Sequence, residues 1–334
     1  MRDRSRLLTL LDRVEAAYRR TGADLPFGDS RPSHGAEMEG YFWRVTDTSN
    51  QRVVVILCGI NRHLDGDWAT VAVAAEPGRF VRSAVLRDAY AATDSFFVTA
   101  GSGAITATAD RLSVDLGDDV TVDLELSDRV EWPRVLGAGG VFSVVPYLGQ
   151  YWQPHLLGGS VSGTVRVGTA TWDLARSAVY AEKNWGAGFP ESWWWGQAQG
   201  FDRRDVCVAF TGGVLTAGPL SATVGGLVAR VGAHVIRLTP PMSRVRSETD
   251  GRRWEVRAQG HGYKVHIVGT ASGQPHVLPV PLPAERRNVD TDFEYLAAHL
   301  ALEISGRLSY RGETNLAGLE IGHRPNPTER SPIS

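Results

Sequence analysis

The segment VTVDLELS, residues 120–127, contains the pattern that decides the fold. Its apolar residues alternate strictly with Thr, Asp, Glu and Ser, and an alternation of period two is typical of a β-strand with one buried face. Similar runs occur at residues 53–58, 68–74, 104–109, 112–116, 141–145, 161–167, 178–183, 193–199, 206–210, 227–231, 254–258, 263–268, 299–304 and 316–321. Because no helical segments alternate with these runs, we predict an all-β protein with antiparallel sheets.

So many strands would leave exposed edges unless the sheets close or pack face to face, so we expect two tandem β-barrels or sandwiches. Turn residues interrupt the pattern at 211–226, which predicts a first β domain at 31–218 and a second at 219–325. A Pro-rich stretch at 272–293 reads as a long loop of the kind that covers ligand sites. Residues 326–334 have the composition of a disordered tail.

The first 30 residues are expected to form an amphipathic helix, at 2–20, and a linker. Apolar residues recur there at helical spacing, and arginines occupy the other positions. The stripe consists of Leu7, Leu10, Leu11, Val14 and Tyr18. Such a helix either packs across a sheet or barrel mouth, which is the simpler interpretation, or rests on an anionic membrane surface.

Composition excludes several classes of function. The net charge of -2, from 35 basic and 37 acidic residues, provides no field that would attract nucleic acid. Cys58 and Cys207 lie in apolar runs, where a thiol behaves as a small buried hydrophobe. The histidines are not clustered with other ligand residues, and no phosphate-binding loop occurs, so we expect neither metal nor cofactor. Without a membrane-spanning run or signal peptide, a cytoplasmic protein is expected, with the helix as a candidate for peripheral contact with the inner membrane.

The segment YAEKNWGAGFPESWWWGQAQGF, residues 180–201, concentrates the residues that suggest chemistry. In an extended chain Tyr180, Glu182 and Asn184 point to one side, and Lys183 and Trp185 point to the other. By the same alternation, one face of the next strand carries two tryptophans and two amides, which are Trp193, Trp195, Gln197 and Gln199. A wall of aromatic rings with a few polar groups is typical of a ligand cavity, although these rings could equally fill a core.

The same segment resembles the signature of the tocopherol cyclase family, in which a Tyr-Ala-Glu-Lys-Asn-Trp-Gly run leads through Phe-Pro to a Trp-x-Trp strand. Two flanking segments are similar to other parts of that family in the same order. They are MEGYFWRV at 38–45 and ETNLAGLEIG at 313–322, and SVSGTVRV precedes the signature at the right distance. The resemblance extends over residues 33–323.

This resemblance implies a lipocalin-like, calycin-type β architecture and a cofactor-independent cyclisation. An alkene of a prenyl side chain is protonated, and a quinol hydroxyl captures the carbocation to close a chromanol ring. Glu182 is the first candidate for the acid, because burial among tryptophans would keep it protonated. Glu39 and Glu320, in the two flanking motifs, are the rival acids, or the base that receives the quinol proton.

Other residues of these motifs are candidates for binding the substrate. Tyr180, Asn184, Gln197 and Gln199 could orient the quinol, and the remaining candidates for the cavity wall are Trp193, Trp195, Trp185, Lys183, Tyr41 and Trp43. Glu182 could instead be a structural partner of an arginine such as Arg44. Two other functions stay open, namely a carrier of a hydrophobic quinol and a related isomerase, hydratase or cycloaddition catalyst acting on another polyene.

Overall fold

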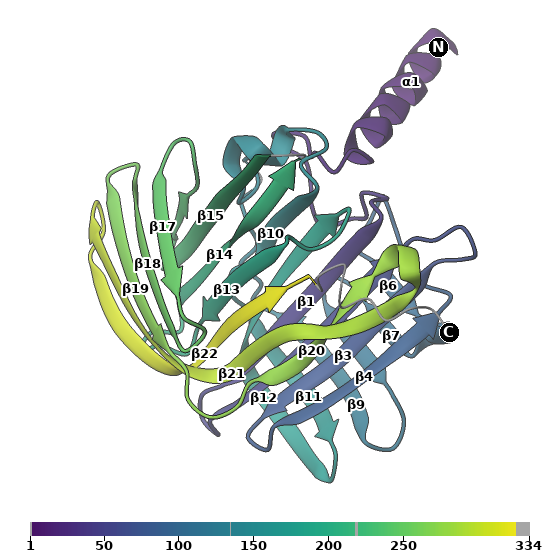
Figure 1. The fold of residues 1–334 in the computed structure, drawn as a ribbon. Helices are drawn as coiled ribbons and strands as arrows, with labels where there is room; N and C mark the ends of the chain where they lie inside the picture. Colours follow the sequence, from purple (N-terminus) through teal and green to yellow (C-terminus); the bar gives the residue numbers. More distant parts are fainter. Residues whose placement is uncertain (1, 134, 218–219, 325–334) are drawn as a thin grey trace.

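The computed structural model describes residues 2–133, 135–217 and 220–324, with side chains described at residues 11–133, 135–214 and 221–324. It contains one α-helix, α1 (Arg2–Arg19), followed by strands that form two antiparallel sheets (Figure 1). Short 3₁₀ helices lie at Gly101–Gly103, Gly140–Val144 and Pro283–Glu285. The predicted all-β architecture is therefore confirmed.

The first sheet has the strand order β4-β3-β2-β1-β12-β11-β9-β8-β7-β6-β5, and β10 also pairs with β12. Its strands are β1 (Met38–Asp47), β2 (Arg52–Asn61), β3 (Trp68–Glu76), β4 (Phe80–Arg87), β5 (Tyr90–Ala91), β6 (Val98–Ala100), β7 (Ile105–Ala107), β8 (Arg111–Asp115), β9 (Val120–Ser127), β10 (Gln150–Leu156), β11 (Ser160–Val167) and β12 (Ala170–Gly186). The long strand β12 pairs with three neighbours, β1, β10 and β11, so it is the centre of this sheet.

The second sheet has the order β16-β15-β14-β13-β22-β21-β19-β18-β17, and β20 pairs with β21. Its strands are β13 (Ser192–Ala198), β14 (Val206–Ala217), β15 (Leu220–Val231), β16 (His234–Leu238), β17 (Arg244–Thr249), β18 (Arg253–Gly260), β19 (Tyr263–Thr270), β20 (His276–Leu282), β21 (Arg287–Gly306) and β22 (Tyr310–His323). Figure 1 shows β13 and β22 next to the first sheet and β17 to β19 at the far edge.

The change from one sheet to the other lies between Gly186 and Ser192, upstream of the predicted domain boundary at 218. Turn residues are dense in 211–226, but β14 and β15 pair continuously from Val206↔Val231 to Ala217↔Leu220. Residues 206–217 and 220–231 therefore pair with each other within the second sheet. The tail predicted at 326–334 lies outside the described residues.

Two predicted segments were wrong in detail. Residues 141–145, predicted as a strand, lie mostly in the 3₁₀ helix Gly140–Val144, where Asp24 N donates to the Ser143 carbonyl at 2.8 Å. The 272–293 segment, predicted as a loop, contains β20 and the start of β21. Prolines tolerate extended backbone wherever no ladder hydrogen bond is needed, so they did not exclude a strand here.

Helix α1 is confirmed, but its predicted packing across a sheet or barrel mouth is wrong for the residues with described side chains. Figure 1 shows the helix standing away from the sheets, and residues 11–17 are exposed. Leu11 and Val14 of the apolar stripe are 56% and 59% exposed. Only the last turn is anchored, where the Tyr18 hydroxyl donates to the Val144 carbonyl. None of the described helices is long and apolar enough to cross a bilayer.

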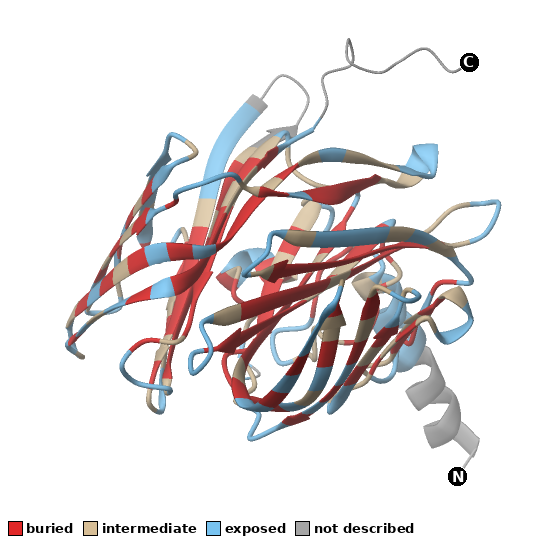
Figure 2. Cartoon of the chain, turned by 90° about the horizontal axis from the view of Figure 1, so that it is seen from below, coloured by how far each residue is buried: buried red, intermediate tan, exposed pale blue. Residues whose placement is uncertain are grey.

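Alternation along the strands separates the apolar residues into distinct cores (Figure 2). Tyr41, Trp43 and Ala181 belong to the core enclosed by the first sheet, while Phe210 and Trp254 belong to that of the second. A smaller cluster, with Tyr180 and Trp195, joins β12 to β13 and β14. Cys58 and Cys207 are buried free thiols, as predicted.

A buried ion pair fastens the N-terminal linker to the first sheet. Lys183 Nζ lies 2.8 Å from Glu39 Oε2, and both side chains are fully buried. The lysine also contacts Pro32 O and His34 Nδ1 at 2.8 Å each, and Glu39 accepts hydrogen bonds from the backbone N–H groups of His34 and Gly35. Burial alone would raise the pKa of Glu39, but Lys183 and its other partners lower it to about 2, so this carboxylate is ionised.

Removing one member of this pair leaves the other charge buried without compensation. Glu39→Gln is therefore expected to reduce the free energy of unfolding by about 3–5 kcal/mol, measured by urea denaturation. Asp123→Asn, which removes an exposed pair with Arg111, is the control and should cost less than about 1 kcal/mol. A similar small loss for both variants would contradict the anchoring role of the buried pair.

Candidate active site

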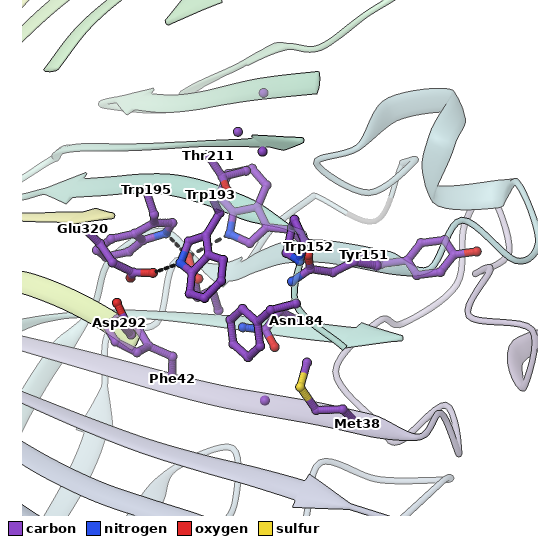
Figure 3. Close-up of a pocket in the computed structure, with 18 of the residues that line it drawn as sticks. Met38, Phe42, Tyr151, Trp152, Asn184, Trp193, Trp195, Thr211, Asp292 and Glu320 are labelled. Carbon is purple, nitrogen blue, oxygen red and sulfur yellow. Dashed lines mark hydrogen bonds between the residues drawn. The ribbon is translucent and has the colours of Figure 1, made fainter. Parts of the chain in front are cut away.

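The two sheets enclose between them a predominantly apolar cavity of ≈ 340 Å³. This volume lies within the range of small-molecule sites, roughly 300–1,000 Å³. Strands of both sheets and the loop around Gly140–Val144 form its wall (Figure 3). The main side chains of the wall are Met38, Phe42, Leu57, Phe142, Tyr151, Trp152, Glu182, Asn184, Phe189, Trp193, Trp195, Thr211, Leu278, Asp292, Glu294 and Glu320.

Glu182 reaches the cavity because β12 alternates its side chains between two sides of the sheet. Its Oε2 atom accepts three hydrogen bonds, from Tyr180 Oη at 2.5 Å and from the indole Nε1 atoms of Trp152 and Trp195 at 2.9 Å each. No hydrogen bond to Oε1 is found among the described residues. One oxygen is thus fixed by three donors, and the other is available to a ligand.

The environment of Glu182 has opposing effects on its pKa. Burial disfavours the carboxylate and raises the pKa above its ordinary value, and the hydrogen bonds from Tyr180, Trp152 and Trp195 offset part of that increase. Three donors are therefore oriented to stabilise the carboxylate form of Glu182. The site still favours the protonated form more than water does.

Glu320 and Asp292 form a second acidic pair in the wall. Trp193 Nε1 donates a hydrogen bond to Glu320 Oε1, and Asp292 lies next to Glu320 in the same wall (Figure 3). Burial, and then the charge of Glu320, raise the pKa of Asp292 well above its ordinary value, while burial and nearby Glu182 raise that of Glu320 to about 7.

Glu294 completes a cluster of four carboxyl groups. Its side chain is fully buried, and its backbone lies opposite that of Glu320 in the ladder between β21 and β22. Burial and the charge of Glu320 raise the pKa of Glu294 to about 8. Arg44 is also fully buried nearby, and burial lowers its pKa to about 10 while the charge of Glu294 opposes that change. The cavity therefore combines an apolar wall with several carboxyl groups that hold protons near neutral pH.

The structure brings only part of the predicted set to this cavity. Glu182, Glu320, Asn184, Trp193 and Trp195 line it, and Tyr41 borders it with its ring packed against Trp43 and Phe96. Tyr180 lies behind the wall and acts on the cavity through Glu182. The residues that do not line it are Glu39, Trp43, Lys183, Trp185, Gln197 and Gln199.

Strand alternation explains why these residues are elsewhere. The side chains of Lys183 and Trp185 point to the opposite side of β12 from that of Glu182. Glu39 lies on this opposite side too, where it forms the ion pair with Lys183. A carboxylate with a pKa of about 2 has no proton to donate near neutrality, so the geometry does not support Glu39 as an acid. Trp43 follows the same phase in β1 and packs in the core of the first sheet.

Gln197, in β13, and Gln199, just after it, fill structural positions beyond the cavity. Gln197 Oε1 accepts a hydrogen bond from Arg44 Nε at 2.9 Å, and Gln199 Nε2 donates to Thr46 Oγ1 at 3.2 Å. Arg44 donates its remaining bonds to the carbonyls of Leu296 and Leu316. Arg44 is thus bound by an amide and by backbone, and the alternative in which it pairs with Glu182 is not supported.

Sequence reasoning missed Asp292, Glu294, Trp152 and Phe42. The two carboxyl groups are two residues apart in VDTDFEYL, which is the spacing of one face of a strand, but the prolines upstream made this segment look like a loop. Trp152 lies in QYWQPHL, which was not read as a strand because its alternation is weak. Phe42 lies between Tyr41 and Trp43, the two predicted binding residues, but its side chain is on the opposite face of β1.

No group of three or more His, Cys, Asp or Glu side chains arranged to hold a metal ion is found within residues 2–133, 135–217 and 220–324. The chemistry that the described side chains can supply is proton transfer from a buried carboxylic acid, hydrogen bonding by indole and amide groups, and contact with aromatic faces. All three would act on a largely apolar ligand.

Solved proteins share this fold. The kievitone hydratase from Nectria haematococca aligns with a TM-score of 0.52 and 12% identity, over 88% of this chain and 91% of that one. The structure of CghA with Sch210972 aligns with a TM-score of 0.56 and 12% identity, over 85% and 88% of the two chains. These likenesses concern the fold, and they agree with the lipocalin-like architecture that the resemblance implied.

Sequence comparison identifies the family. The probable chloroplastic tocopherol cyclase of Oryza sativa subsp. japonica is 24% identical over 213 residues, which are 56% of this chain and 42% of the rice protein. The chloroplastic tocopherol cyclase of Zea mays is 23% identical over 216 residues, which are 58% and 43% of the two chains. The match thus spans less than half the length of these relatives. A family model described as tocopherol cyclase-like matches residues 102–323, which is more than half of the chain, and the protein therefore belongs to the tocopherol cyclase-like family.

Proposed function

We propose that this protein is a cofactor-independent cyclase that converts a prenylated quinol into a chromanol. The observation that carries the proposal is the state of Glu182, a buried carboxyl group in an apolar cavity with a raised pKa and one oxygen held by three donors. Family membership and the similarity to plant tocopherol cyclases support the same reaction. The ligand would be hydrophobic, in agreement with the largely apolar wall.

The first step is proton transfer from Glu182 to the prenyl alkene. The Oε1–H bond breaks, the alkene π electrons form the new C–H bond, and a tertiary carbocation remains. The quinol oxygen then bonds to this carbon, and its proton returns to the Glu182 carboxylate. No atom is gained or lost, so the reaction needs no external oxidant, reductant or co-substrate.

The three donors on Oε2 explain how a carboxyl group could protonate an alkene. As the proton leaves Oε1, negative charge develops on the carboxylate, and Tyr180, Trp152 and Trp195 are already oriented to stabilise it. Preorganised donors act more strongly in a dry site than in water, because no solvent must reorganise. The three donors thus stabilise the negative charge on the Glu182 carboxylate, where it develops.

The tryptophan rings could also shield the carbocation. Cation–π contact contributes roughly 0.5–2 kcal/mol per ring, whereas enzymes lower barriers by about 8 kcal/mol or more. The rings alone are therefore insufficient, and most of the acceleration would come from the buried acid and from holding alkene and hydroxyl together in the cavity. Asn184, whose Oδ1 atom has no hydrogen-bond partner among the described residues, is available to orient a hydroxyl group.

Replacing the acid provides the direct test. Glu182→Gln keeps the shape of the side chain but removes the transferable proton, so chromanol formation from a prenylated trimethylhydroquinone should fall by about 10²–10⁴-fold. Binding of the same quinol, followed by quenching of tryptophan fluorescence, should change little. Chromanol can be measured by chromatography, which also separates hydrated or rearranged products.

Glu125→Gln, at an exposed position of β9, is the matched control and should retain full activity. If Glu182→Gln forms chromanol as fast as the wild type, the acid is another group, and Glu320 is next in line. If the wild-type protein binds the quinol but never changes it, the carrier function replaces the enzyme. A hydrated or cycloaddition product would instead favour a different reaction in the same cavity.

The dependence of rate on pH should have a defined sign. An acid must be protonated to act, and burial raises the pKa of Glu182 above its ordinary value. We therefore expect kcat/KM to be highest at acidic pH and to decrease as the pH rises across about pH 5–9. A rate that increases over this range would contradict acid catalysis, because it would indicate activation of the quinol as its anion.

A further inference from the structure

Three carboxyl groups of the cavity have no part in the proton transfer assigned to Glu182. Asp292 and Glu294 lie two residues apart on β21, and Glu320 is the cross-strand partner of Glu294 on β22. All three line the cavity from the second sheet, whereas Glu182 enters it from the first. Figure 3 shows Asp292 and Glu320 next to each other at one end of the labelled residues.

Three buried oxygens of this group have no hydrogen-bond partner among the described residues. Glu294 is fully buried, and neither of its carboxyl oxygens makes a hydrogen bond within the described chain. Asp292 is 8% exposed, and its Oδ1 atom is equally without a partner in that part of the chain. A buried polar group without a partner is destabilising, so native proteins keep few of them. These three oxygens belong to side chains that line one cavity, where a ligand could supply the missing hydrogen bonds.

A purely structural role as counter-ions of Arg44 does not explain these carboxyl groups. Arg44 donates to Gln197 and to two backbone carbonyls, and it forms no ion pair within 4 Å in the described residues. Its Nη1 atom is itself unpartnered. Glu294 Oε1 and Arg44 Nε both approach Gly318, where an added Cβ would lie 3.1 and 3.4 Å from them. The positive charge of Arg44 therefore offsets part of the negative charge of the carboxyl groups. The carboxyl oxygens themselves stay available to a ligand.

We infer that Asp292, Glu294 and Glu320 form a subsite that binds the hydroxyl groups of a phenolic or hydroquinone ring. A hydroxyl group both donates and accepts, and a carboxylic acid offers an acceptor oxygen and an O–H donor to match it. The identity of the ring rests on the proposed function, whereas the preference for hydroxyl groups rests on the unpartnered oxygens alone.

The subsite fixes the orientation of the substrate. The hydroxylated ring lies against β21 and β22, and the prenyl alkene next to the ring then lies toward Glu182 on β12. A ligand that lacks hydroxyl groups leaves the carboxyl oxygens buried and unpaired, so it binds more weakly even if its apolar contacts are the same.

The test compares two probes that differ only in hydroxyl groups. One is a prenylated trimethylhydroquinone, and the other is the same prenylated ring without its two hydroxyls. Quenching of tryptophan fluorescence gives both dissociation constants. The wild type should prefer the hydroquinone by about tenfold or more, and Glu294→Leu should reduce that preference to about threefold or less.

Two further variants make the comparison specific. Glu294→Gln keeps both a donor and an acceptor, so it should retain most of the preference, and Glu303→Gln, at an exposed position of the same strand, should retain all of it. If Glu294→Leu does not fold, Asp292→Ala removes a second member of the subsite and should reduce the preference in the same way. An unchanged tenfold preference in a folded Glu294→Leu or Asp292→Ala protein would overturn the inference.

The subsite and the proposed reaction fail in different ways. Glu182→Gln should keep the preference for hydroxyl groups while losing chromanol formation. If the wild type shows the preference but forms no chromanol, the subsite stands and the cyclase function does not. If chromanol forms but the wild type binds both probes equally, the cyclase function stands and the subsite does not.

Discussion

The structure depends on two adjacent residues of β12, the acidic Glu182 and the basic Lys183. Both are buried, but on opposite sides of the strand. Glu182 points between the sheets, and Lys183 points into the first sheet, where it pairs with Glu39 at 2.8 Å. A shift of register by one residue would place the ammonium group in the apolar cavity and the carboxyl group next to Glu39. Both outcomes would bury charge without compensation, so electrostatics fixes the register of the central strand as firmly as apolar packing does.

This alternation also explains how much could be predicted from the sequence. An alternation of period two predicts most of the strands, and it correctly places Glu182 and Asn184 on one face of β12 and Lys183 and Trp185 on the other. It could not show which face meets the other sheet, because side chains on both faces are buried in the second half of β12, residues 179–186. Lys183 and Trp185 were therefore chosen as binding residues although they lie on the side away from the cavity.

The omissions have a different physical cause. Asp292 and Glu294 join the site through pairing between β21 and β22, and the local pattern does not reveal that their strand crosses the cavity. Gln197 was chosen on the correct face of β13, but the cavity ends before it, and its amide is used by buried Arg44. Periodicity gives the direction of a side chain, whereas the position of a cavity along a strand depends on how two sheets pack.

The tryptophans that first suggest a binding wall have a second role in this arrangement. Trp152 and Trp195 donate to Glu182, and Trp193 donates to Glu320, so each indole both covers apolar surface and fixes a carboxyl oxygen. A phenylalanine would cover the same surface without the N–H donor. Because an isolated carboxylate in an apolar cavity is unfavourable, the indole donors stabilise the ionised forms of Glu182 and Glu320. The same tryptophan side chains therefore form the apolar wall and orient two of its acids.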